Sequence, residues 1–449
     1  MRDLFYFTLL AMAMIYTLRQ PWIGIMSWTI VSIMSPHVFG HRIKTFPVAM
    51  VVAVVTLIAF LAIRDNKRKF PVCRETATFM MLMLWFCITL PFSYDVEGSY
   101  EGWKKVMKID FMILIALAML RTKHHIEVLV WMLAISIGFY GVKGGIFTIT
   151  SGGNDRVWGP ESTFIEGNNE LALAIIMIIP FMRYLQMRSQ SRWLKLALLG
   201  SMLISVASAL GSHSRGALLA LAAMAAVLWV RSKNKFTTLL IGVVVGGAFY
   251  SFMPSHWFNR METIGEYQAD GSAMGRINAW WMAYNLAKDK FFGGGFNIYN
   301  PVMFGKYAPD PTDIHAAHSI YFQILGEHGF IGLFIYLLLW LFVWLSANDL
   351  RKRGAKLPQT QWVADLGAMC QVSMAGYFVG GAFLSLAYFD LPYNTMIVIV
   401  LARAWLDRKG WIEEEAEAAA LAAKEAEKAG KGAVKKKPSR LRWTWGTAA

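Results

Sequence analysis

Long apolar runs recur along this chain of 449 residues, and they constrain its fold more than any other feature. Many of them reach the length of about 20 residues with which an α-helix crosses the hydrocarbon core of a bilayer. Backbone polar groups in lipid must be paired within the protein, and the runs are too long for the alternating strands of an outer-membrane barrel. The sequence therefore predicts an all-α polytopic membrane protein and excludes a soluble globular fold.

The start of the chain leaves two possible topologies. The segments 4–18 and 21–35 are each short for a crossing and are separated by Arg19, Gln20 and Pro21. Counted as one broken unit, they give about 12 transmembrane helices with both chain ends inside, which is the topology we expect. Counted as two crossings, they would place the N-terminus outside. The later spans are expected near residues 46–63, 75–91, 105–121, 125–149, 168–186, 193–211, 215–231, 236–253, 318–347, 362–387 and 391–407.

Basic residues, which give the chain a net charge of +15, are concentrated in alternate segments between the spans. By the positive-inside rule these segments are cytoplasmic. The other segments, residues 92–103, 151–167 and 254–316, are acidic or mixed and are predicted to lie in the periplasm. The charge thus reflects orientation in the membrane, and no nucleic-acid partner is expected. The basic segments are residues 64–74, 121–123, 188–195, 231–235, 351–356 and 408–409.

This topology divides the chain into four parts. N-terminal transmembrane helices occupy residues 1–253, a large periplasmic loop residues 254–317, C-terminal transmembrane helices residues 318–408, and a charged cytoplasmic tail residues 409–449. The tail starts with good helix formers and ends in a basic segment suited to anionic membrane lipid. The three cysteines form no disulfide or zinc pattern, and the absence of a Walker motif argues against ATP-driven transport.

The stretch GSHSRGALLAL, residues 211–221, places a cation at the outer end of a predicted span. Ser212 or Ser214 is suited to cap the helix, so that Arg215 falls in its first turn. The helix dipole disfavours a cation there by about 0.3 to 1 kcal/mol, and the positive-inside bias also disfavours it. A bound anion would reverse both penalties. The alternative is an arginine that reaches toward lipid headgroups.

A second arginine of this kind lies in the large loop, within residues 271–296. Ser272 is suited to cap a helix that runs to about Lys290, and the glycines 293–295 would end it. Arg276 then occupies the first turn, where an acidic residue is usual. An apolar face suits this helix to packing on the membrane or against the spans, and it comprises Met274, Ile277, Trp281 and either Trp280 or Tyr284.

Three of the nine histidines lie in HAAHSIYFQILGEHG, residues 315–329. Thr312 or Asp313 is suited to cap a helix that begins at Ile314, in which His318 would lie on an inward-facing aromatic stripe. A packed core histidine is the structural alternative. A metal site is a further alternative, but no HExxH or Asp-rich motif accompanies these histidines.

These residues suit the transfer of a glycan from a lipid pyrophosphate at the periplasmic face of the membrane that holds the protein. The guanidinium fork matches phosphate oxygens two at a time, which is the role expected of Arg215 and Arg276. A histidine, whose ordinary pKa is about 6.5, can accept the proton of an attacking hydroxyl, and we expect His318 to be this base. A lipid-linked glycan transporter, which would bind the same pyrophosphate without cutting it, is the alternative from another class.

The order of these motifs resembles the O-antigen ligase (WaaL-like, Wzy-C) superfamily, which also contains O-antigen polymerases and protein O-oligosaccharyltransferases. The resemblance is carried by HSRG, by GR ahead of an aromatic helix and FFGGGF, and by HAAHSIYFQILGEHGFIGLF, and it covers about residues 1–408. The stretch GGNDRVWGPESTFIEGNNELALA, residues 152–174, also resembles the subgroup of O-glycosylation ligases associated with exosortase systems.

The resemblance implies a GT-C-type, inverting and metal-independent glycosyltransferase of the bacterial inner membrane that needs no cofactor. It implies an undecaprenyl pyrophosphate-linked glycan as donor and the lipid A core as acceptor, with a protein or a growing glycan as the alternative acceptor. The family's essential histidine falls on His318, and its two arginines fall on Arg215 and Arg276. Many members have asparagine where this chain has Ser319, which replaces an amide donor by a hydroxyl.

Five further residues are candidates for substrate binding. Lys143 is a cation near the outer end of a span, where it is costly unless paired, so donor phosphate would suit it. Arg156, Asn168 and Asn169 could hold glycan or phosphate, and Asp390 lies near the outer end of the last span. Ordinary interhelical hydrogen bonding or helix capping is the alternative for each of these residues.

Overall fold

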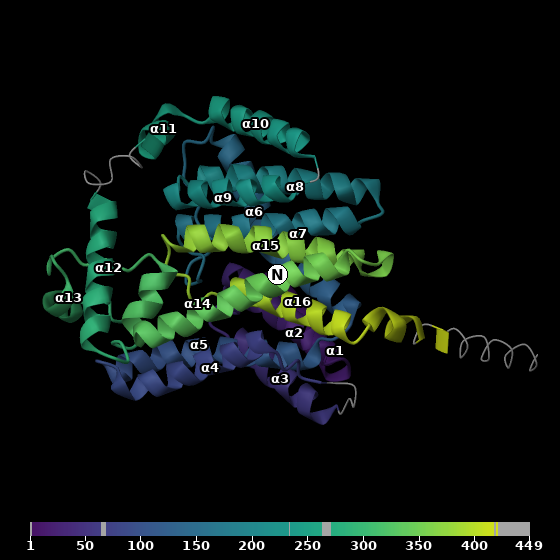
Figure 1. Ribbon diagram of the computed structural model, residues 1–449, viewed down its shortest axis with the longest axis horizontal. Helices are drawn as coiled ribbons and strands as arrows, with labels where there is room; N and C mark the ends of the chain where they lie inside the picture. The colour runs from purple at the N-terminus through teal and green to yellow at the C-terminus, as the bar shows by residue number, and fades with distance from the viewer. Residues whose placement is uncertain (1, 64–68, 233, 263–270, 417–418, 421–449) are drawn as a thin grey trace, which may run out of the picture.

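The computed structural model describes residues 2–63, 69–232, 234–262, 271–416 and 419–420. Within these residues the regular secondary structure is helical and contains no strand. Most helices run along one common axis, whereas α12 (Gly271–Asp289) lies across one end of the bundle (Figure 1). We call this end the His318 end. The opposite end, from which the C-terminal segment extends, is called the Arg121 end.

The helices of the first half of the chain alternate in direction between the two ends. They are α1 (Arg2–Arg19), α2 (Trp22–Thr29) with its π-helical continuation η1 (Ile30–Met34), η2 (Pro36–Phe39), α3 (Val48–Ala62), α4 (Arg74–Thr89), η3 (Leu90–Phe92), α5 (Val96–Met119), α6 (Lys123–Thr150), α7 (Asn168–Arg188), α8 (Arg192–Gly211), α9 (Arg215–Arg231) and α10 (Lys235–Phe252). The second half contributes α11 (Ser255–Glu262), α12, α13 (Pro301–Tyr307), α14 (Ile320–Gly354), η5 (Pro358–Thr360), α15 (Gln361–Gly381) and α16 (Asp390–Asp407).

Six helices of the described residues are long and apolar enough to cross a membrane: α4 with η3, α6, α7, α8, α10 and α14. The α2–η1 segment and α3 are apolar but shorter. The all-helical architecture with several apolar crossings is that of a multi-pass membrane protein, as the sequence predicts. The charged tail predicted at residues 409–449 lies outside the described residues, except for residues 409–416 and 419–420.

Residues 2–34 form two antiparallel helices, so the single broken unit expected from the sequence is wrong. At the start of α1, the Asp3 carboxylate accepts hydrogen bonds at 2.9–3.3 Å from the backbone N–H groups of residues 41–43. At the start of α2, the Trp22 ring stacks on His125, with 4.9 Å between ring centroids. His125 belongs to the first turn of α6, at the Arg121 end.

The chain returns to the His318 end through η1. Ser32 of η1 donates a hydrogen bond to Asp390, which begins α16 at that end. The break at Gln20 and Pro21 is therefore a turn between two helices, since Pro21 has no N–H with which to continue α1. The first described residues consequently lie at the His318 end.

Most other predicted spans agree with the helices, and the clear differences lie at three ends. One of them is the end of α14, which lies at Gly354 and not at residue 347. The span expected at 105–121 is the longer α5, because Asp95 caps it by accepting a hydrogen bond from Gly98 at 3.0 Å. Much of the predicted periplasmic segment 92–103 is therefore helical. The span expected to reach residue 387 ends at Gly381, which leaves a loop at residues 382–389 next to the candidate site described below.

Close packing around α7 fixes the centre of the bundle. Every residue of α7 from 171 to 182 is buried. Beside it, glycines of α6 face small groups of α8: a Cβ added to Gly145 would lie 1.9 Å from the Ile204 carbonyl oxygen. Small residues allow helices in lipid to approach closely, because van der Waals contact takes the place of the hydrophobic effect there.

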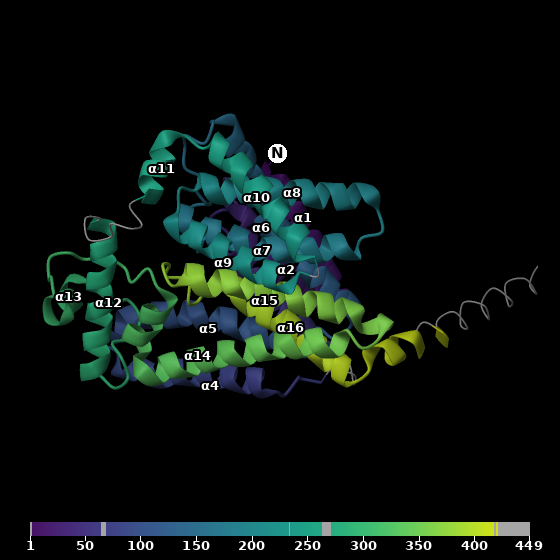
Figure 2. The same cartoon turned by 45° about the horizontal axis from the view of Figure 1, so that its top comes forward.

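The helix α12 packs on α14 through a different face from the one predicted. Met274 and Trp281, on the predicted apolar face, are 42% and 51% exposed. The opposite face, with Ala279, Met282 and Ala283, is buried. Figures 1 and 2 both show α12 beside the first turns of α14. The exposed apolar face is therefore available to the membrane surface.

Candidate functional site

Arg215 lies in the first turn of α9, where the sequence predicts it. Ser214 caps this helix, and its Oγ accepts a hydrogen bond from the Ala217 N–H at 3.1 Å. The turn before α9 is held by α7, because the Asn168 side-chain amide donates to the Ser212 carbonyl at 2.7 Å. The position of Arg215 is therefore fixed by contacts from a second helix.

His213 adds a further constraint on the same turn. Its φ angle of 56° lies in the left-handed region, which is uncommon for a residue with a side chain. Its Nε2 donates a hydrogen bond to the Gly153 carbonyl at 2.9 Å, and the ring is buried. The α6–α7 loop thus clamps the turn that precedes Arg215.

The segment ahead of α14 has no regular secondary structure, so the helix expected from Ile314 is wrong. Residues 313–319 are irregular, and α14 begins at Ile320. Asp313 does not cap a helix here. Its Oδ1 lies 2.8 Å from Nε2 of His315 and forms an ion pair with it when the imidazole is protonated.

Two side chains of α12 hold this irregular segment in place. The Asn278 amide donates hydrogen bonds to the carbonyls of Asp310 and Asp313 at 2.8 and 2.9 Å. The Trp280 indole N–H donates to the carbonyl of Ala317 at 2.7 Å. These tertiary bonds take the place of the intrahelical bonds that local propensity favours.

His318 is held between α12, α14 and the α15–α16 loop. Its backbone N–H donates to Oγ of Ser385 at 3.0 Å, and its φ angle is 41°, again in the left-handed region. The Trp280 ring stacks on Phe322 of α14, with the ring centroids 5.0 Å apart and the planes 5° from parallel. Strained backbone of this kind persists only where the surroundings fix it.

The structure brings Arg215, Arg276 and His318 together, and we call these three residues the arginine–histidine cluster. The pKa of Arg276 is lowered by burial and then by repulsion from Arg215, while Glu170 opposes the shift. The pKa of His318 is lowered to about 4 by burial and by the positive charges of Arg276 and His315. His318 is therefore neutral at pH 7, with one ring nitrogen able to accept a proton.

Two buried nitrogen atoms of the cluster have no hydrogen-bond partner among the described residues. They are Nδ1 of His318 and Nε of Arg276. Buried polar groups in proteins are nearly always paired, so such atoms call for a partner from beyond the described residues. A neutral imidazole can accept a hydrogen bond through the nitrogen without a proton, and the guanidinium Nε–H can donate to an anionic oxygen.

Three of the further candidates lie on or just before α7. Asn168 is a structural residue in this arrangement, since its amide supports the turn before Arg215. Asn169 follows it and is half-buried, whereas Arg156 in the α6–α7 loop is exposed.

The two remaining candidates have other neighbours. Lys143 is exposed, and its ammonium lies 5.5 Å from the centre of the Phe39 ring. Asp390 is buried and accepts a hydrogen bond from Ser32, although its Oδ1 has no partner among the described residues. No described hydrogen bond or ion pair connects either candidate to the cluster.

Glu170 and Ser385 are site residues that the sequence reasoning missed. Glu170 is the third residue of α7 after the cap at Gly167, the position of the acid in a capping box. Its Oε2 would lie 2.0 Å from a Cβ added to Gly167, so the carboxylate folds back over the helix start. The GNNE pattern could have identified Glu170. No local signal marks Ser385, which reaches His318 only through the tertiary fold.

The glycines 293–295 lie against a break in α14 that the sequence did not reveal. Gly329 has φ 71° and ψ −176°, which interrupts the helix. The carbonyls of Gly326 and Glu327 accept hydrogen bonds at 2.9 Å from the backbone of the 293–295 turn. The large loop is thereby bonded directly to the helix that follows His318.

His328 belongs to a buried network beside this break and is separate from the cluster. Its ring nitrogens lie 2.9 Å from the Thr89 hydroxyl and 2.8 Å from the Tyr388 hydroxyl. Tyr388 also donates a hydrogen bond to Glu327. All four side chains are buried, so the network connects α4, α14 and the loop before α16.

Metal-binding groups and surface pockets add little to the description of the site at the His318 end. Among the residues that the structure describes, no three His, Cys, Asp or Glu side chains are grouped closely enough to hold a metal ion. Two surface pockets of about 340 and 440 Å³ lie at the Arg121 end.

Comparisons with known families divide the chain into two matched parts. Residues 1–190 match a family of unknown function, DUF5935. Residues 200–337 match the family described as O-antigen ligase, Wzy_C. A search of curated proteins found no match. The matched region 200–337 contains Arg215, Arg276 and His318, and this part of the chain is similar to the O-antigen ligase (Wzy-C) superfamily.

Proposed function

We propose that this protein is an O-antigen ligase that transfers a glycan from undecaprenyl pyrophosphate to a hydroxyl of the lipid A core. The reaction is inverting and metal-independent in this proposal, and the protein is a GT-C-type glycosyltransferase of lipopolysaccharide biosynthesis. The observation that carries the proposal is the arginine–histidine cluster, which lies inside the region matched to the O-antigen ligase family.

The chemistry follows from the charges of the cluster. His318 removes the proton from the acceptor hydroxyl, whose oxygen attacks the anomeric carbon of the donor sugar. The bond between that carbon and the pyrophosphate oxygen breaks, and undecaprenyl pyrophosphate leaves with the bonding electrons. Arg215 and Arg276 stabilise the negative charge that develops on the leaving group. Attack from the face opposite the leaving group inverts the anomeric configuration.

Donor binding also adjusts the basicity of His318. In the free protein, burial and the charge of Arg276 hold the pKa of His318 near 4, which makes it a weak base. A pyrophosphate between the two arginines offsets that charge, so the pKa rises toward its ordinary value when the donor is bound. His318 thus becomes a better base only in the presence of substrate.

The orientation in the membrane follows from the basic segments at the Arg121 end. In the bacterial inner membrane, the positive-inside rule places this end and the C-terminal segment in the cytoplasm. The His318 end then faces the periplasm, where the lipid-linked donor and the lipid A core would meet. Lys143, Arg156, Asn169 and Asp390 are secondary candidates for contact with the glycan or its phosphate.

The test uses the purified full chain, a defined undecaprenyl pyrophosphate glycan and rough lipopolysaccharide. We expect longer lipopolysaccharide and free undecaprenyl pyrophosphate as products. The His318→Ala variant should lower kcat by about 10² to 10⁴, the range of general acid–base catalysis, while donor binding is retained. His41→Ala is the matched control, because His41 is an exposed histidine near the same end.

The outcomes separate the alternatives. Product on a protein or on a growing glycan would identify a protein O-oligosaccharyltransferase or an O-antigen polymerase of the same superfamily. Full function of His318→Ala together with movement of intact donor across vesicles would identify a transporter. Resemblance to the exosortase-associated subgroup stays a prediction.

A further inference from the structure

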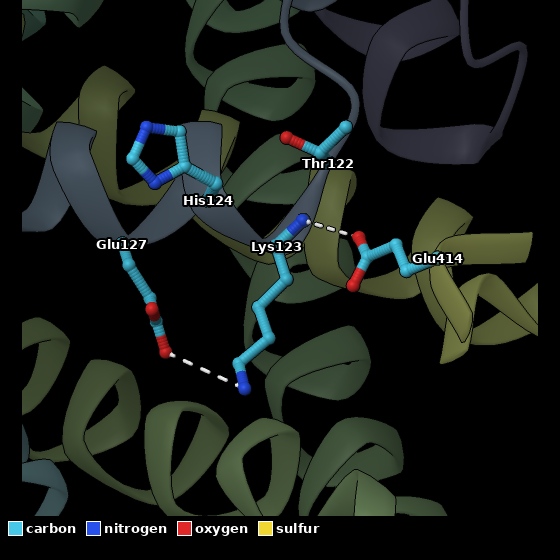
Figure 3. Close-up of a pocket in the computed structure, with 5 residues that line it drawn as sticks. All are labelled: Thr122, Lys123, His124, Glu127 and Glu414. Carbon is cyan, nitrogen blue, oxygen red and sulfur yellow. Dashed lines mark hydrogen bonds and ion pairs between the residues drawn. The ribbon is translucent and has the colours of Figure 1, made fainter. Parts of the chain in front are cut away.

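A pocket of about 440 Å³ opens between α6, α7 and α8 at the Arg121 end, remote from the proposed catalytic cluster. Lys123 and Glu127 of α6 line it, and they also line the adjoining pocket of about 340 Å³. Figure 3 shows this second pocket, in which Lys123 stands between Glu127 and Glu414 of the C-terminal segment. The two pockets therefore share one cation, Lys123, and one anion, Glu127.

The lining of the larger pocket carries more positive than negative charge. The Lys123 ammonium is 3.9 Å from the Glu127 carboxylate, a long ion pair that leaves donors free for another group (Figure 3). Arg188, at the end of α7, forms no ion pair with a carboxylate among the described residues. With two cations and one anion on its walls, the pocket favours an anionic ligand.

One residue that lines the same pocket has a buried hydroxyl without a partner in the described part of the chain. Tyr184 lines the pocket and is 0% exposed, and its hydroxyl forms no hydrogen bond within the described part of the chain. A buried hydroxyl without a partner costs free energy, and nearly all such groups in proteins are satisfied. An oxygen atom of a bound ligand would satisfy Tyr184.

The remaining walls are apolar or belong to a helix start. Trp131 and Leu194 line the pocket beside the polar groups, and Ser191 caps the start of α8. The positive end of the α8 dipole adds to the attraction for an anion. The ligand must therefore combine negative charge with apolar parts, at a level where the helices end and lipid headgroups lie.

We propose that the pocket between α6, α7 and α8 binds the headgroup of an anionic phospholipid. Lys123 and Arg188 contact its phosphate, Tyr184 hydrogen-bonds an oxygen of the phosphate or glycerol, and Trp131 and Leu194 contact the adjoining acyl chains. Basic pockets between transmembrane helices at the cytoplasmic level are suited to such lipids. The site is independent of glycan transfer, because none of its residues belongs to the arginine–histidine cluster.

The test is a titration of the delipidated full chain in detergent, followed by native mass spectrometry. The probes are phosphatidylglycerol, phosphatidylcholine and inorganic phosphate. We expect phosphatidylglycerol to bind and phosphatidylcholine to bind at least several-fold more weakly. Arg188→Gln should weaken phosphatidylglycerol binding about fivefold, the effect of one cation near a lipid phosphate. Tyr184→Phe, which removes only the unpartnered hydroxyl and keeps the ring, should weaken it as well.

Arg192→Gln is the matched control, because Arg192 is an exposed cation at the same end that does not line the pocket. Equal loss of binding in Arg192→Gln and Arg188→Gln would overturn the proposal, since it would show only general surface attraction. Equal binding of both phospholipids would overturn it too. Displacement of phosphatidylglycerol by millimolar inorganic phosphate would assign the pocket to a soluble phosphate instead of a lipid.

Discussion

His318 combines an unusual backbone with a neutral ring at the point where three elements meet. Its φ angle is 41°. Two hydrogen bonds hold this backbone: one from the His318 N–H to Ser385, and one from the Trp280 indole N–H to the carbonyl of the preceding residue, Ala317. Burial and neighbouring cations keep the ring uncharged at pH 7. The environment of His318 therefore suits it to catalysis, because it keeps the ring neutral. The pH dependence of activity should report the pKa of this ring.

A pH profile measures this environment directly. A base must be unprotonated to act, so activity is present above the pKa of His318 and is lost as the pH falls through it. We expect the acid limb of kcat/KM, which reports the free protein, near pH 4. The acid limb of kcat should lie at higher pH, because bound pyrophosphate offsets the charge of Arg276. Coincident limbs near pH 6.5, the ordinary histidine value, would contradict this account.

At the scale of the element, α12 acts as a support for the segment that carries His318. Trp280 is the connection, since its indole N–H bonds Ala317 at 2.7 Å. Trp280→Phe removes this bond and keeps an aromatic ring against Phe322. We expect kcat to fall by about tenfold, the equivalent of one lost hydrogen bond, with donor binding unchanged.

The matched control for this change is Trp281→Phe, on the exposed face of the same helix, where the side chain is 51% exposed. It should leave kcat unchanged. Equal losses in the two variants would show that α12 acts through the membrane surface instead of through Ala317.

A methyl group added to the turn at residues 293–295 should lower the stability of the protein. Gly293 has φ 74°, and a Cβ there would lie 2.6 Å from the backbone nitrogen of Gly329. Gly293→Ala should therefore lower stability by at least about 1 kcal/mol from the backbone conformation alone. Thermal unfolding in detergent gives the measurement. Gly305→Ala is the control, because an added Cβ meets nothing within 4 Å there, and it should be neutral or stabilising.

At the scale of the whole molecule, a buried ion cluster ties α4, α14 and α16 together near the Arg121 end. Glu75 is 0% exposed and accepts hydrogen bonds from Arg74 at 2.8 Å, from Arg403 at 3.3 Å and from Ser346. These helices come from distant parts of the chain, so the cluster should matter to global stability more than to chemistry.

Removal of the buried carboxylate tests this expectation. Glu75→Gln leaves partly buried arginines without their partner, and breaking a buried pair costs about 3 kcal/mol. We expect a clearly lower unfolding temperature in detergent, with kcat per folded molecule unchanged. Glu97→Gln provides the comparison, because Glu97 is an exposed acid in the first turn of α5. A loss of kcat without a loss of stability would instead connect the buried ion cluster around Glu75 to catalysis.

Local patterns in the sequence determined much of this architecture. Apolar runs give the position of most spans, because transfer of apolar side chains into lipid depends on composition and length. The start of α9 follows from Ser214, since a helix cap is a contact between residues close in the chain. Local patterns of this kind also mark Arg215, Arg276 and His318 as candidate site residues.

Only the tertiary structure decided how these residues meet. The bonds from Asn278 and Trp280 to the segment before α14 override the helix that local propensity favours, because they pair the same backbone groups from outside. The antiparallel α1 and α2 likewise depend on contacts of Asp3 with residues 41–43. Apolar runs and caps act within a few residues, so the sequence alone determined most of the spans and the start of α9. The position of His318 beside Arg276 depends on contacts between distant segments, and it required the fold.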